Sequence, residues 1–176
     1  FVSESTTPTA ITPSSAGSGI VSGISVKADD QSGVMATWSN YNIDSCFFTS
    51  DASVASPSWS NVEGNLSAHS FRSTAVVGTG NDIMYYVGTA RGLYSTSNLN
   101  GSSTTWSRES QNKLGYALVS SLRYRPSDGK LAIGTHGNGI FETTTLEATA
   151  YNTWNGSQSS DWNDTDNWSD GVPTSA

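Results

Sequence analysis

Three short stretches decide the fold: Phe47-Phe48-Thr49-Ser50-Asp51, Tyr94-Ser95-Thr96-Ser97-Asn98 and Phe141-Glu142-Thr143-Thr144-Thr145. Each begins with an aromatic residue and has Thr two positions later, and each lies 47 residues after the one before it. A tryptophan follows the first two aromatic residues after 12 positions, and these tryptophans, Trp59 and Trp106, are again 47 residues apart. Self-similarity at one fixed period predicts a repeat architecture.

The surroundings of these stretches repeat as well. Residues 88–94 match residues 134–141 with one extra residue, and an apolar-rich run begins each unit at about residues 24, 75 and 122. Gly, Asn, Asp and Pro cluster between the runs, which is typical of turns between strands. The expected strands are 21–29, 33–39, 44–50 and 57–62 in the first unit, 71–78, 82–89, 92–97 and 104–109 in the second, and 117–125, 130–135 and 139–145 in the third.

Four short strands in each unit of about 47 residues predict an all-β protein of the β-propeller type. We expect a partial β-propeller of about three four-stranded blades, a fragment of a larger ring. The third unit lacks its fourth strand, and residues 1–5 resemble residues 106–110, as if they ended a preceding unit. We therefore expect a piece of a longer polypeptide, with residues 1–148 as the C-terminal blades. The alternative is a β-sandwich in which the similarity is accidental.

Composition limits the possible classes. The chain has 176 residues, of which 32 are Ser and 20 are Thr, only 13% are charged, and the net charge is −7. Eight basic against 15 acidic residues exclude a basic nucleic-acid surface. No stretch approaches the roughly 18 apolar residues of a membrane span. A single cysteine, Cys46, excludes a disulfide within the chain, and its apolar neighbours predict a small core residue.

The repeat resembles the Asp-box, or BNR, motif. Thr49-Ser50-Asp51-Ala52 leads to Ser58-Trp59, Thr96-Ser97-Asn98 leads to Thr104-Thr105-Trp106, and both copies carry extra residues before the tryptophan. Residues 131–141, with Gly134-Thr135-His136-Gly137-Asn138-Gly139, are similar to a signature of sortilin-like and xyloglucanase-like propellers. The resemblance covers about residues 1–148 and implies that the box is a fold element. The residues expected to be structural are Phe47, Asp51, Trp59, Tyr94, Asn98, Trp106 and Phe141.

A tail of different character follows. Residues 151–176 hold half of all the tryptophans, and their spacing resembles the opening of β-rich modules in secreted bacterial proteins, notably those exported by the type IX route. We place a boundary near residues 147–151, with 149–176 as the start of a further module or a linker. Asp161 and Asn163 echo the start of an EF-hand, but Asp166 replaces its glycine and Val172 cannot be its bidentate Glu. A solvated turn anchored by tryptophan is therefore favoured over calcium, which stays a weak possibility.

Function in propellers usually lies on one face, built by the loops between second and third strands and between blades. This places Asn40, Tyr41, Arg91, His136 and Asn138 at one mouth, where amide, aromatic and guanidinium groups would bind sugar hydroxyls or carboxylates. His69 and Tyr116 are possible neighbours. A backbone hydrogen bond in the glycine-rich turn would explain His136 equally well.

The sequence favours a binding protein over an enzyme. A glycoside hydrolase needs two facing carboxylates, whereas these loops carry only Asp44 and Glu63, and no metal-binding spacing of His and Cys occurs. The leading hypothesis is a non-catalytic, extracellular or cell-surface propeller for adhesion, with a glycan or a cell-surface protein as partner. One alternative is an extracellular glycoside hydrolase of the xyloglucanase or sialidase type, with catalytic residues elsewhere in the protein. Another is secreted cargo bound to a type IX secretion machine.

Overall fold

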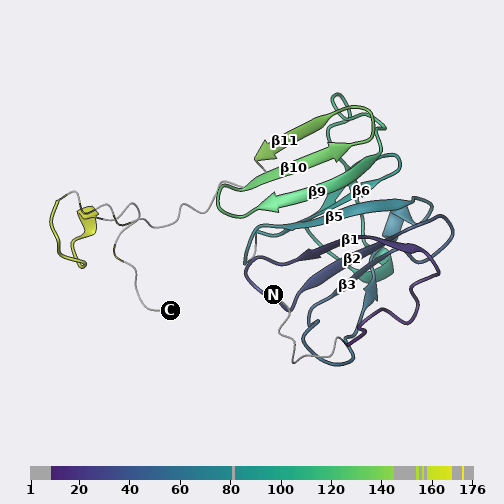
Figure 1. The fold of residues 1–176 in the computed structure, drawn as a ribbon, viewed down its shortest axis with the longest axis horizontal. Helices are drawn as coiled ribbons and strands as arrows, with labels where there is room; N and C mark the ends of the chain where they lie inside the picture. Colours follow the sequence, from purple (N-terminus) through teal and green to yellow (C-terminus); the bar gives the residue numbers. More distant parts are fainter. Residues whose placement is uncertain are drawn as a thin grey trace.

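The structure, a computed structural model, describes residues 9–80, 82–144, 154, 156, 158–167 and 172. These residues form three antiparallel sheets that lie side by side (Figure 1). None of the helices among them is long and apolar enough to cross a membrane. The first sheet contains β1 (Ile20–Val26), β2 (Val34–Ser39), β3 (Cys46–Thr49) and β4 (Ser60–Asn61); the second contains β5 (Phe71–Val77), β6 (Met84–Thr89), β7 (Gly92–Thr96) and β8 (Ser107–Arg108); the third contains β9 (Val119–Arg125), β10 (Lys130–Thr135) and β11 (Ile140–Thr144).

The expected all-β class is confirmed. Each strand lies within the range that the repeat predicts, except that β1 begins one residue earlier, at Ile20. The fourth strands are shorter than expected, with two residues each in β4 and β8. Three single turns of 3-10 helix, η1 (Gly64–Leu66), η2 (Gly101–Ser103) and η3 (Thr165–Asn167), interrupt the connections. The described residues form separate sheets and no closed barrel. The expected boundary near residues 147–151 lies outside the described residues.

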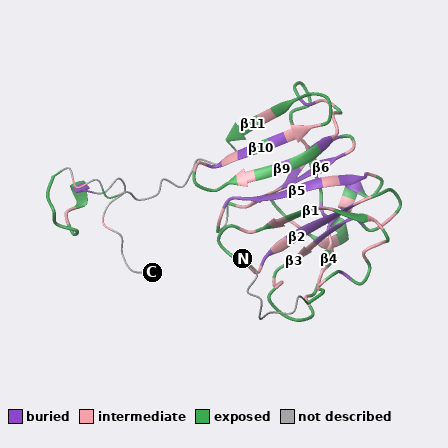
Figure 2. Cartoon of the chain, in the orientation of Figure 1, coloured by how far each residue is buried: buried purple, intermediate pink, exposed green. Residues whose placement is uncertain are grey.

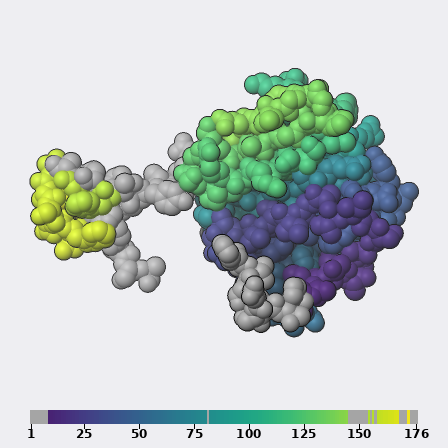
Figure 3. Space-filling view, viewed as in Figure 1, coloured from purple at the N-terminus to yellow at the C-terminus, as the bar shows by residue number. Residues whose placement is uncertain are grey.

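The first strands of the three sheets are adjacent, since β1 packs against β5 and β5 against β9. Figure 3 shows the sheets as consecutive purple, teal and green bands. The middle strand β5 is buried along almost its whole length (Figure 2) because a sheet covers it on either side. This close approach requires small residues: a Cβ added at Gly23 would lie 2.9 Å from the amide nitrogen of Thr74, and one at Gly88 would lie 2.5 Å from the carbonyl oxygen of Val119.

Serine hydroxyls satisfy the free backbone groups where these first strands meet. A backbone group on a strand edge that is buried without a partner costs stability, so such edges need donors or acceptors from elsewhere. Here the neighbouring sheet supplies them through side chains. The hydroxyls of Ser22 and Ser73 donate to the carbonyls of Phe71 and Val119, and that of Ser25 accepts from the amide of Val76.

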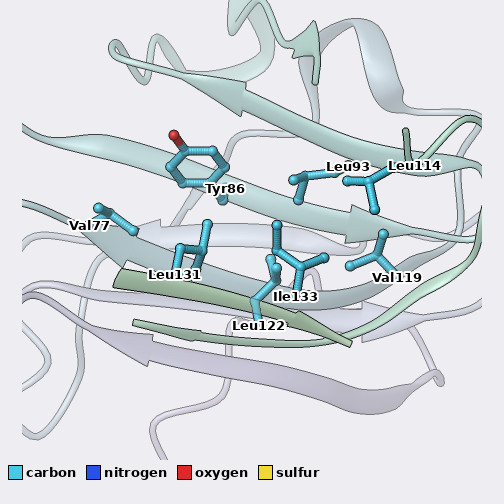
Figure 4. Packing of buried hydrophobic residues seen from close by; sticks show 9 residues of the cluster. Val77, Tyr86, Leu93, Leu114, Val119, Leu122, Leu131 and Ile133 are labelled. Atoms are coloured by element: carbon cyan, nitrogen blue, oxygen red, sulfur yellow. The ribbon is translucent and has the colours of Figure 1, made fainter. Parts of the chain in front are cut away.

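Two apolar clusters fill the spaces between successive sheets. The cluster between the first and second sheets contains Met35, Cys46, Val62, Leu66, Phe71, Val76, Val87 and Trp106. The cluster between the second and third sheets is shown in Figure 4. It contains Ala75, Val77, Tyr86, Leu93, Leu114, Val119, Leu122, Leu131 and Ile133. Cys46 is fully buried, which raises the pKa of its thiol and agrees with the predicted core residue.

The two outward-facing sides of this stack differ. On the first sheet, the segment before β1 covers the outer side, and the indole nitrogen of Trp59 donates to the carbonyl of Ile11 at 2.7 Å. On the third sheet the outer side is polar, with an ion pair of 2.5 Å between Lys130 and Glu142. Within the described residues no fourth strand pairs with β11.

Candidate functional site

The loops between second and third strands lie at the same end of the three sheets, because the equivalent strands run in the same direction. Backbone hydrogen bonds fix two of these loops to the connections between sheets. The amide of Ala90 donates to the carbonyl of Ser70, and the amide of His136 donates to the carbonyl of Leu118, both at 2.9 Å. We call this the loop end of the molecule.

Two arginines and an exposed tyrosine gather at the loop end of the second sheet. The guanidinium carbon of Arg108 lies 3.6 Å from the centre of the Tyr116 ring, and that of Arg91 lies 5.7 Å from the same centre. Arg108 also donates to the carbonyl of Gly115, which holds it against the ring. Tyr116 is nevertheless 67% exposed, so much of its ring remains accessible to a ligand. Cation–π contacts of this kind keep both arginines close to the aromatic surface.

His69 extends this cluster on the side of Tyr94. The rings of His69 and Tyr94 meet edge to face, with 5.4 Å between their centres, and the Tyr94 hydroxyl lies 3.4 Å from Nε2 of His69. Burial, and then the positive charge of Arg91, lowers the pKa of His69 below its usual value. Because of its burial and the nearby charge of Arg91, the imidazole of His69 loses its proton at a lower pH than an exposed histidine does.

Several polar atoms in this region have no hydrogen-bond partner. Nδ1 of His69, the hydroxyl of Ser70 and Nε of Arg108 are buried without one. None of the salt bridges in the described part of the chain involves Arg91 or Arg108. Unpaired guanidinium groups beside unsatisfied polar atoms form a site suited to an anionic or strongly hydrogen-bonding ligand. We call Arg91, Arg108, Tyr116, His69 and Tyr94 the cationic–aromatic site.

Of the predicted ligand-binding residues, only Arg91 belongs to this site. Asn40 turns back on its own loop, where its side chain accepts from the amide of Tyr41 at 2.9 Å. Tyr41 is 51% exposed, and His136 and Asn138 are exposed on the loop between β10 and β11. In residues 9–80 and 82–144, no hydrogen bond or ring contact links these four side chains to Arg91. These four residues lie at the loop end with Arg91 but do not form one site with it.

Sequence reasoning named Tyr116 and His69 only as neighbours and missed Arg108. Arg108 lies on β8, where it pairs with Tyr94. Its position in the fourth strand of the repeat does not suggest that it binds a ligand. No motif marks it. Its importance arises from the connection after β8, which brings Gly115 and Tyr116 back over its side chain.

The structure places the three residues of the first repeat that were expected to be structural in packing or turn positions. Phe47 is 1% exposed and meets Trp38 edge to face at 5.4 Å. The carboxylate of Asp51 accepts from the amide of Ser53 at 2.9 Å and from its hydroxyl, and these bonds lower the pKa of Asp51. Trp59 is half-buried beside the segment before β1.

The threonine of the motif makes the same turn bond in the first and second repeats. The hydroxyl of Thr96 accepts from the amide of Asn98, as that of Thr49 does from Asp51, whereas the Asn98 side chain makes none of the hydrogen bonds found in residues 82–144. Trp106 is 3% exposed, and Phe141 packs against the cluster between the second and third sheets. The sequence shows this threonine only as a repeated residue. In the structure its hydroxyl stabilises the turn that follows the third strand.

The carboxylates at the loop end are not arranged as a facing pair. Glu63 is buried and accepts from the backbone amide of Ser45 and from the side chain of Asn61. Burial raises its pKa, and the negative charge of Asp44 adds to this effect. Since Glu63 already binds its own turn, its role here is to hold that turn.

The tail residues that the structure describes are organised around a buried asparagine. Asn167 is fully buried, and its side-chain oxygen accepts from the amides of Gln158 and Ser159. Trp162, by contrast, is 58% exposed. Oδ1 of Asp161 accepts from the amide of Asn163 at 2.9 Å, as in an ordinary Asx turn. No group of three His, Cys, Asp or Glu able to hold a metal ion occurs among the described residues.

Comparison of the chain with protein-family models, with curated proteins and with solved structures finds no match.

Proposed function

We propose that this chain is part of a non-catalytic β-propeller that binds a glycan or a cell-surface protein outside the cell. The ring architecture is supported by three sheets that lie side by side with their first strands adjacent. It is also supported by backbone bonds that recur at the period of the sequence. The amides of Val62 and Glu109, 47 residues apart, donate to the carbonyls of Cys46 and Leu93, also 47 residues apart, and both bonds are 2.9 Å long.

The observation that carries the binding function is the cationic–aromatic site. Arg91 and Arg108 lie against the exposed ring of Tyr116 and have no carboxylate partner in the described part of the chain. An aromatic face with unpaired guanidinium groups can stack on a sugar and bind its hydroxyls or an acidic group. The external location rests on composition, namely abundant Ser and Thr with little charge.

A non-catalytic role is favoured over the glycoside hydrolase because of Glu63. A catalytic acid must reach the glycosidic oxygen of its substrate. Glu63 is only 5% exposed, and its carboxylate is already used by Ser45 and Asn61. Because the Glu63 carboxylate is buried and hydrogen-bonded to its own turn, a structural role for Glu63 is favoured over a catalytic one.

Binding to a glycan array tests the proposal directly. The unaltered chain should bind a subset of glycans, and the double variant Arg91→Ala with Arg108→Ala should lose at least about tenfold in affinity, as expected for losing two charge-assisted contacts. Arg125→Ala is the matched control, because this arginine is exposed, lies at the opposite end of β9 and is paired with Asp128. Equal loss in both variants would contradict the site, and release of reducing sugar by the unaltered chain would replace binding with hydrolysis.

A further inference from the structure

An open groove lies between the second and third sheets beside β11. Its volume is about 300 Å³. Its wall combines an apolar part, formed by Tyr86, Leu93, Leu114, Ile133 and Phe141, with polar side chains that include Glu109, Lys113 and Glu142. In the described part of the chain, the outer edge of β11 has no paired strand next to this groove. An unpaired edge beside a groove with an apolar part is a position that another strand can occupy.

The equivalent position between the first and second sheets is filled by Trp106. This side chain is 3% exposed, and its indole nitrogen donates to the carbonyl of Val62 at 2.9 Å. Asn65 holds the backbone of Trp106 on both sides: its side-chain oxygen accepts from the Trp106 amide at 2.8 Å, and its side-chain nitrogen donates to the Trp106 carbonyl at 3.0 Å. The fourth strand of the second sheet follows directly at β8.

The open groove has the same frame. Glu109 corresponds to Val62, since each donates a 2.9 Å backbone bond to the third strand of its own sheet. Leu114 corresponds to Leu66, and both are 2% exposed. Asn112, 47 residues after Asn65, lies exposed in the turn between Glu109 and Leu114. Glu109 lines the groove, and Asn112 lies in the adjoining turn, so the two residues stand where Val62 and Asn65 stand beside Trp106.

The chain carries a tryptophan at the required spacing. Trp106 follows Tyr94 by 12 residues, and Trp154 follows Phe141 by 13. Both are preceded by threonine, in Thr105-Trp106 and Thr153-Trp154. In the structure Trp154 is 42% exposed, so a large apolar ring remains to be buried.

We propose that Trp154 of this same chain docks in the open groove and that its segment adds to the free edge of β11 as a fourth strand. The Trp154 indole then donates to the carbonyl of Glu109, and the Asn112 side chain binds the Trp154 backbone. The repeat unit extends past Trp154, so the boundary to the tail lies after this residue and not before it. This inference concerns how the third sheet is completed and does not depend on the proposed binding function.

Hydrogen exchange of the β11 amides in the full chain, read by NMR or mass spectrometry, tests the docking. Trp154→Ala should speed exchange at β11 by about tenfold or more, because an edge that loses its partner strand opens locally. Trp162→Ala is the matched control, since Trp162 is also a tail tryptophan and is 58% exposed. Exchange in β5 should be equal in both variants, which shows that the sheets stay folded. Equal β11 exchange in the two variants would overturn the proposal.

A second variant and a dilution series separate the alternatives. Asn112→Ala should speed β11 exchange in the same direction as Trp154→Ala, whereas Asn100→Ala, another exposed asparagine at a turn, should not. The protection of β11 should be unchanged by dilution. Protection that disappears on dilution together with a dimer in size-exclusion chromatography would assign the groove to a second copy and overturn docking within the chain.

Discussion

The connection from the first sheet to the second, residues 62–71, and the connection from the second to the third, residues 109–119, share one backbone frame but differ in what fills it. In both, a leucine at 2% exposure, Leu66 or Leu114, lies in the turn of the connection. Its carbonyl accepts from the amide three residues later, that of His69 at 2.7 Å or Ala117 at 3.0 Å. The first connection is closed by Trp106, and the second borders an open groove.

The difference shows that the repeated backbone does not by itself produce an equally packed interface. Hydrogen bonds at equivalent positions give the two connections the same backbone course, while one large side chain decides whether the space beside them is filled. Glu63 and His69 also give the first connection titratable groups, where the second has Ser110 and Ala117. The two connections should therefore respond differently to truncation and to pH.

Truncating Trp106 should have the largest effect. Trp106→Ala removes a buried ring and the bond to Val62, and we expect a loss of about 3–5 kcal/mol in the free energy of unfolding, measured with urea. Trp162→Ala, at a tryptophan that is 58% exposed, should change it by less than about 0.5 kcal/mol. A similar small loss for both variants would show that the first connection is no better packed than the tail.

Truncating the paired leucines should sharpen the contrast. Both Leu66→Ala and Leu114→Ala remove an equally buried side chain, and such changes cost about 2–5 kcal/mol, depending on how far the site relaxes. In the Trp154→Ala variant, which would leave the groove open, Leu114→Ala should fall at the lower end of this range because its surroundings are less closely packed. Urea unfolding of the leucine variants in that background checks the order. A larger loss at Leu114 there would mean that something other than Trp154 fills the groove.

Much of this frame was predictable from the sequence, because a period of 47 residues repeats both strands and turns. Thr49 and Thr96 occupy matching turns because a threonine hydroxyl can accept from the amide two residues later. For the cationic–aromatic site, the sequence predicts Arg91 as a ligand-binding residue and His69 and Tyr116 only as its neighbours. The site's other arginine, Arg108, reaches Tyr116 through a fold of the second connection that no period encodes, and such contacts depend on tertiary packing alone.

The pH dependence of stability should come mainly from the first connection. Burial raises the pKa of Glu63, so the folded state holds this proton more tightly than the unfolded state does. Stability is therefore highest where Glu63 is protonated and falls as the pH rises from its usual pKa through the raised value. Glu63→Gln should lose less stability than the unaltered chain between pH 4 and pH 7 in urea unfolding. Parallel pH profiles of the two proteins would contradict this origin.

The smallest effect is expected at His69, whose counterpart in the second connection is Ala117. Burial and Arg91 lower the pKa of His69, so its contribution to stability is present above the usual histidine pKa and is lost as the pH falls through the lowered value. Arg91→Ala removes the second cause and should move this pKa upward in an NMR titration of the imidazole. Arg125→Ala, at an arginine paired with Asp128, should leave it unchanged. An unmoved pKa in both variants would place Arg91 too far from His69 to act, and the cationic–aromatic site would then reduce to Arg108 and Tyr116.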